Sequence, residues 1–168
     1  MMKIMGLILL FASCTGAGCL KSMQLAEEVR LWERFLRFVL FVENTLRGMQ
    51  STTTELTELY HTLHPEDPLT RMCCSRCRNG QPFPEAWVQS VEQLRAGWGL
   101  SPEGQRILME FGAGLGTTDV EGQLNHAAAY RLLGQEQRTA AAAAQTQKAR
   151  MYVMLGAALG LGLDLMLL

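Results

Sequence analysis

The sequence predicts an all-α fold, a six-helix bundle whose long C-terminal helix runs into a membrane span. Two observations support this class. Apolar residues recur at intervals of three and four, which places them on one face of a helix. No segment alternates apolar and polar residues in the way a half-buried strand does. The 168 residues suffice for one domain with a core, and the net charge of -1 offers no basic field for nucleic acid.

The chain begins with an uncharged segment between Lys3 and Lys21. As a helix these residues would extend about 25 Å, slightly less than the roughly 30 Å of a bilayer's hydrocarbon layer. A lysine followed by a short apolar run is also typical of a secretory signal, and "FASC" resembles a lipoprotein cleavage box with Cys14 as the lipidated residue. We interpret residues 1–22 as an N-terminal transmembrane helix, and a cleaved lipoprotein or exported helical domain is the alternative.

The C-terminal segment, residues 151–168, is apolar enough to predict a second transmembrane helix. Gly156 and Gly160 form a G-x-x-x-G face, although glycines are also ordinary in membrane helices. Asp164 lies close enough to the end to reach the far interface. Lys148 and Arg150 precede this segment, and positive charges favour the cytoplasmic side. Residues 23–150 are therefore expected to form a cytoplasmic helical bundle, with both termini across the membrane.

The first half of that bundle contains three predicted helices. The first covers residues 23–47 and ends at Gly48; its apolar face includes Leu25, Val29, Trp32, Leu36 and Val39. Ser51 is the predicted cap of a second helix, which ends before Pro65. A third helix is expected over residues 69–78.

The second half contains three more helices. The fourth is expected from Glu85 to about Gly97. Ser101 and Pro102 supply the cap and the first-turn proline of the fifth. The sixth is predicted to run from near Val120 straight into the C-terminal span, since five consecutive alanines, 140–144, favour an uninterrupted helix.

The glycine-rich stretch between the fifth and sixth helices, "FGAGLGTTDVEGQ", does not match a phosphate-binding loop. A Walker loop requires a lysine, and none occurs between Lys21 and Lys148. A dinucleotide-binding loop follows a strand, whereas a helix precedes these glycines. We therefore predict a tight corner, in which a glycine ends one helix in the left-handed conformation and Thr118 or Asp119 caps the next.

This stretch, followed by a long helix and a terminal span, resembles the stage III sporulation protein AB family of endospore-forming bacteria. The family pattern is roughly F-G-x-x-L-G-x-x-D-x-x-x-Q, and six residues match it by position: Phe111, Gly112, Leu115, Gly116, Asp119 and Gln123. "EAW", residues 85–87, falls where the family tends to have a tryptophan. The resemblance covers the whole chain, and it implies a structural role in packing for the six residues.

The resemblance also implies a function and partners. Family members are non-enzymatic membrane proteins of the channel complex that links mother cell and forespore after engulfment. Their soluble domain is similar to the cytoplasmic domains of the type II secretion platform protein. By that likeness the chain is expected to lie on the mother-cell side of the outer forespore membrane. There it would couple a secretion-type ATPase, stage III sporulation protein AA, to other membrane proteins of the stage III A operon.

A zinc-binding module is the remaining alternative. His61, His64, Cys74 and Cys77 form H-x2-H followed by C-x2-C, and all four side chains are of types that zinc accepts. Cys73 adjoins this set, and the spacing between the pairs is not that of a common zinc finger. We predict no cofactor, no small-molecule substrate and no catalytic residue, and we interpret His126 as a packing or surface residue.

Overall fold

The computed structural model describes the backbone of residues 2–48 and 52–167, and the side chains of Met23, 25–48, 52–147, Met151 and Met154. Six helices make up this part of the chain: α1 (Met2–Gly48), α2 (Thr53–Leu63), α3 (Pro68–Arg78), α4 (Phe83–Trp98), α5 (Pro102–Gly114) and α6 (Val120–Leu167). Within these residues there is no strand, so the predicted all-α class and the six helices are confirmed.

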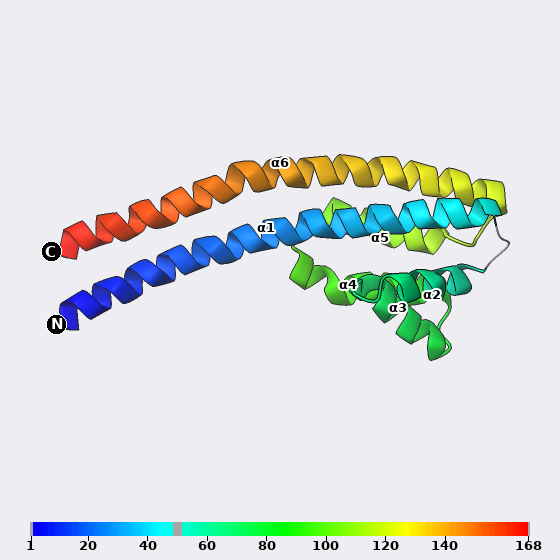
Figure 1. The fold of residues 1–168 in the computed structure, drawn as a ribbon, viewed down its shortest axis with the longest axis horizontal. Helices are drawn as coiled ribbons and strands as arrows, with labels where there is room; N and C mark the ends of the chain where they lie inside the picture. Colours follow the sequence, from blue (N-terminus) through cyan, green and yellow to red (C-terminus); the bar gives the residue numbers. More distant parts are fainter. Residues whose placement is uncertain (1, 49–51, 168) are drawn as a thin grey trace.

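Two long helices determine the shape of the molecule. α1 and α6 run antiparallel along each other, and both ends of the chain lie at the same end of the pair (Figure 1). The four short helices gather near the other end, where α2 and α4 contact α1 and α5 contacts α6. α3 lies between α2 and α4, and α4 packs on α5. The chain therefore consists of a compact bundle and a two-helix extension that leaves it.

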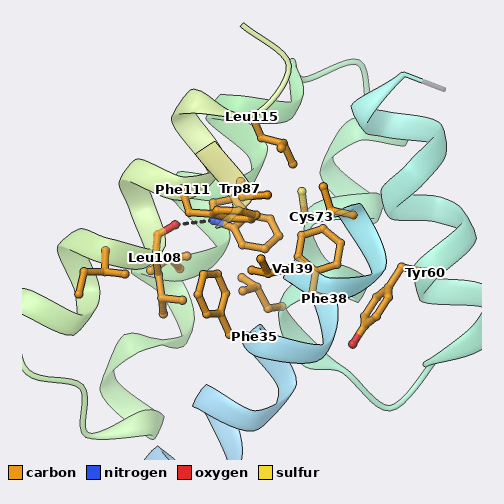
Figure 2. Packing of buried hydrophobic residues seen from close by; sticks show 14 of the residues in the cluster. Phe35, Phe38, Val39, Tyr60, Cys73, Trp87, Leu108, Phe111 and Leu115 are labelled. Carbon is orange, nitrogen blue, oxygen red and sulfur yellow. Dashed lines mark hydrogen bonds between the residues drawn. The ribbon is translucent and has the colours of Figure 1, made fainter. Parts of the chain in front are cut away.

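An aromatic cluster forms the centre of the bundle, where α1, α4 and α5 meet (Figure 2). Phe38 stacks on Trp87 with ring centroids 5.1 Å apart, and Phe111 meets Phe35 edge-on at 5.1 Å. Trp87 and Phe111 are completely buried. Full burial of one such side chain stabilises the fold by about 1.5–3 kcal/mol, and favourable ring geometry adds about 0.5–1.5 kcal/mol per pair.

Apart from the start of α1, the predicted helix boundaries agree with the structure to within two residues, and the differences have local causes. The predicted cap Ser51 lies outside the described residues, and α2 is capped by Thr52. The Thr52 hydroxyl accepts a hydrogen bond from the N–H of Glu55, and the Glu55 carboxylate accepts one from the N–H of Thr52. α4 begins at Phe83, two residues before the prediction, because Pro84 fits the first turn of a helix. Gly99, in the left-handed conformation at φ 64, ends it.

Both long helices are continuous. α6 runs unbroken from Val120 to Leu167, as predicted, and α1 extends the predicted first helix to Met2. Among the residues whose side chains are described, no helix is both long enough and apolar enough to cross a membrane. The predicted spans, 1–22 and 151–168, lie outside these residues apart from Met151 and Met154, and so do the side chains of Cys14 and Asp164.

Candidate functional site

The corner between α5 and α6 begins with a glycine that touches a tryptophan. A Cβ atom at Gly112 would lie 2.0 Å from Cδ1 of Trp87, a separation that no real contact allows. The indole is fixed there, because Trp87 Nε1 donates a hydrogen bond of 2.7 Å to the carbonyl oxygen of Leu108 (Figure 2). Only glycine at position 112 lets α5 approach the ring this closely. Phe111, the preceding residue, directs its side chain into the same aromatic cluster.

The helix then ends at Leu115 and Gly116. Leu115 is 1% exposed, and its N–H donates to the carbonyl oxygen of Phe111 at 3.1 Å, which closes the last turn. Gly116 has a φ of +85, the left-handed conformation that glycine adopts without strain. A side chain there would also meet Thr53 of α2, whose Cγ2 would lie 2.7 Å away. The predicted left-handed glycine is therefore Gly116.

The start of α6 is capped by Asp119. Its Oδ1 accepts a hydrogen bond of 2.9 Å from the N–H of Gly122, so of the two predicted caps it is the aspartate that bonds to the first turn. Gln123 Nε2 donates to the carbonyl oxygen of Thr118 at 2.9 Å and ties the helix back to the loop before it. The six residues that match the family pattern thus all lie at this corner. There they pack in the core, allow the turn or form hydrogen bonds that connect α6 to the loop before it.

Sequence reasoning missed how His126 completes this corner. Its Nε2 lies 2.9 Å from the carbonyl oxygen of Phe111, a contact that needs the proton on that nitrogen. The imidazole also stacks on the Phe111 ring, and a Cβ at Gly114 would lie only 2.4 Å from its Cε1. The available signal was its spacing, because His126 follows Gln123 by three residues and therefore shares a face of α6. The expectation of a packing role is consistent with this position.

The four residues of the zinc alternative are not brought together. His64 ends α2 and contacts Glu66, with Nδ1 3.4 Å from Oε1. Cys74 is buried in α3, and desolvation raises the pKa of its thiol to about 11, which disfavours the thiolate that zinc requires. In the described part of the chain, no group of three or more histidine, cysteine or acidic side chains could hold a metal ion. The zinc alternative has no geometric support there.

The titration behaviour of the bundle follows from burial. Desolvation raises the pKa of Tyr60 to about 12 and also raises that of Cys73, whose thiol is fully buried. Both shifts favour the neutral side chain and work against an activated nucleophile. A shallow hollow of about 340 Å³ lies beside the corner, lined mostly by apolar atoms of Pro84, Val88 and Ala113. These features are typical of residues that pack, and an apolar hollow of this kind recognises a ligand by its shape.

Comparison with known protein families agrees with this geometry. The family model described as stage III sporulation protein AB matches residues 3–168. The chain belongs to this family. No curated protein and no solved structure was found that matches the chain significantly. Membership makes the chain a component of the sporulation channel complex, in a family that is regarded as non-enzymatic.

Proposed function

We propose that the chain is a membrane scaffold and adaptor of the mother-cell-to-forespore channel complex. It couples a secretion-type ATPase, stage III sporulation protein AA, to other membrane proteins of the stage III A operon. Residues 23–150 form the cytoplasmic bundle, and residues 1–22 and 151–168 form two spans in the outer forespore membrane, with the bundle on the mother-cell side. The observation that carries this proposal is the rigid corner, which joins the bundle to one continuous helix.

The arrangement of the long helices supports a hairpin in the membrane. α1 and α6 leave the bundle together and end side by side (Figure 1). A chain with two spans and a cytoplasmic middle requires both termini on the same side of the bilayer. The ion pairs between Glu33 and Arg138, and between Glu43 and Arg131, join the two helices where α1 is part of the bundle.

The corner gives the bundle a stiff connection to α6. Gly112, Gly116 and Asp119 leave the turn little conformational freedom, since each position is fixed by a ring, a backbone conformation or a cap. A movement of α4 and α5 therefore shifts α6 as a body, and the helix carries the displacement toward the C-terminal span. Such a connection suits a protein that transmits force from a cytoplasmic ATPase.

The test uses the full chain in lipid nanodiscs, together with purified stage III sporulation protein AA. We expect the two to copurify, and intact mass to show that residues 1–22 are retained. Ala143→Pro should break α6 between the bundle and the span, since proline in a helix interior costs about 3 kcal/mol. This variant should keep ATPase binding and lose spore formation, while Ala143→Ser keeps both.

Two outcomes would contradict the adaptor function. One is a full chain that fails to bind the ATPase although its helical content is intact. The other is normal spore formation by Ala143→Pro, which would mean that no mechanical connection through α6 is needed. A mature N-terminus at Cys14 would instead show that the first span is removed and that the chain is a lipoprotein.

A further inference from the structure

A groove runs between α1 and α6 on a face that the short helices do not cover. The bundle takes one side of α1, on which Trp32, Phe35 and Val39 are buried. The neighbouring side faces α6 and solvent, and it borders a hollow of about 220 Å³. Five residues line this hollow: Leu36, Arg37 and Leu40 from α1, and Arg131 and Gln135 from α6.

The floor of the groove is firm, because the two helices approach closely beneath it. A Cβ at Gly134 would lie 3.1 Å from Leu36 Cδ2 and 3.1 Å from Phe35 Cε1, so glycine lets α6 settle onto α1. The buried carboxylate of Glu43 accepts a hydrogen bond of 3.0 Å from Arg131 Nε and fixes the register of the two walls. The groove is therefore a preformed feature of the helix pair.

Leucine side chains at the groove remain in water. Leu40 is 49% exposed, and Leu36, which lines the same hollow, is only partly buried. Covering these side chains would remove apolar surface from water, at about 25 cal/mol per Å². Leucines that stay partly exposed along one wall of a groove are typical of a surface that packs against another element.

The groove carries positive charge. None of the five lining residues is acidic, and two of them are arginines. Arg131 is already paired with Glu43. Arg37 is exposed and forms no ion pair with the part of the chain that is described. Its charge acts on two groups near the start of α3: it lowers the pKa of the Glu66 carboxyl and works against the raised pKa of the Tyr60 phenol. A ligand with a carboxylate would therefore meet an available guanidinium at the edge of an apolar floor.

The shape and the charge together define the occupant. A hollow of about 220 Å³ is smaller than the roughly 300–1,000 Å³ of small-molecule sites, and it suits one or two side chains of a larger ligand. Two aligned helices present a trough, into which a third helix fits at the usual spacing of about 8–10 Å, whereas a bilayer surface is flat. A second copy meeting the same face about a two-fold axis would bring the Arg37 guanidinium groups toward like charges.

We propose that this groove binds an amphipathic helix of a partner protein, with leucine-like residues at intervals of three and four and acidic residues beside them. The leucines would pack on Leu36 and Leu40, and a carboxylate would pair with Arg37. The groove and its charge do not depend on whether an ATPase binds this chain, so the adaptor function and this site fail or succeed separately.

The test is a titration of the full chain in phosphatidylcholine nanodiscs with a fluorescent synthetic helix. The acidic probe has leucines at intervals of three and four flanked by glutamates, and in the basic probe lysines replace the glutamates. We expect fluorescence anisotropy to give a Kd of about 10 μM for the acidic probe. The basic probe should bind at least about tenfold more weakly, the effect of a reversed charge pair.

Three variants locate the binding. Leu40→Asp and Arg37→Glu should each weaken the acidic probe about tenfold or more, and Arg37→Glu should bind the basic probe better than the natural chain does. Leu59→Asp is the matched control, because Leu59 of α2 is 44% exposed and lies on a different helix. It should leave the Kd unchanged. Far-UV circular dichroism checks that all three variants keep their helices.

Three results would overturn the proposal. Binding of the acidic probe to the Leu40→Asp and Arg37→Glu variants as tightly as to the natural chain would place its contact elsewhere. Equal binding to empty nanodiscs would show that lipid takes the probe. Dimers of the natural chain that Leu40→Asp dissociates into monomers would identify a second copy as the occupant.

Discussion

The corner of the bundle and the pair of long helices are built by opposite means. At the corner, rings and backbone meet without intervening space, as Gly112 does against Trp87 and Gly114 against His126. Between α1 and α6, in the part that the structure describes, the glycine at position 134 and two ion pairs join helices whose leucines remain partly exposed beside them. The difference indicates that the corner fixes one geometry, while the helix pair keeps a surface available for contact.

The largest expected effect tests the corner. Gly112→Ala would place a Cβ atom 2.0 Å from Cδ1 of Trp87, so the ring must move and its hydrogen bond to the carbonyl oxygen of Leu108 must lengthen or break. Overpacking costs about 1–3 kcal/mol, and the lost hydrogen bond about 1 kcal/mol more. We expect a loss of about 2–4 kcal/mol, measured by urea unfolding followed by tryptophan fluorescence.

The matched control for Gly112→Ala lies in α4. A Cβ at Gly97 would have no atom within 4 Å, and Gly97 is helical. Gly97→Ala should therefore stabilise the chain by about 0.5–1 kcal/mol through helix propensity. A loss of the same size in both variants would mean that the Trp87 contact is not what makes Gly112 necessary.

The next effect separates the two ion pairs of the helix pair. Arg131→Ala leaves the carboxylate of Glu43, which is 6% exposed, without its partner. Removal of one member of a buried pair costs about 3–5 kcal/mol, and the partial exposure of Arg131 reduces our expectation to about 2 kcal/mol. Arg138→Ala breaks a pair whose side chains are 47% and 45% exposed, and it should cost less than about 0.5 kcal/mol.

A double-mutant cycle at each pair measures this contrast directly. Coupling energies come from the urea unfolding of the two single variants and the double variant of each pair. Glu43 and Arg131 should show strong coupling, and Glu33 and Arg138 very little. Equal coupling at the two pairs would show that the burial of Glu43 does not strengthen its interaction.

The sequence was sufficient to predict the elements that local signals determine. Ser101 and Pro102 mark the start of α5 in the sequence, and the structure has the Ser101 hydroxyl accepting from the N–H of Gly104. The left-handed glycine and the aspartate cap at the corner were also predictable, because each depends on neighbouring residues alone. The expectation of a corner instead of a phosphate loop followed from the missing lysine.

Contacts between distant segments could not be predicted in the same way. Nothing near Gly112 in the sequence indicates that its partner is Trp87, 25 positions earlier, since only the packing of α4 on α5 brings them together. The same holds for Glu43 and Arg131, which are 88 residues apart. The α1–α6 groove could not be predicted either, because its two walls come from segments far apart in the chain.

The last expected effect depends on pH, and it is a loss of stability at alkaline pH that originates in the packed region. Tyr60 is 1% exposed, and desolvation raises the pKa of its phenol from 10.0 to about 12. The folded chain therefore holds this proton at a pH where the unfolded chain has lost it, so the stability it contributes is full below pH 10 and declines as the pH rises toward 12. Between about pH 9 and 11 this loss of stability amounts to about 1 kcal/mol.

Tyr60→Phe removes the titrating proton but keeps the ring, which packs on Phe38 and Phe41. The free energy of unfolding of this variant should fall less steeply over the same range, and parallel slopes for the two chains would contradict the assignment.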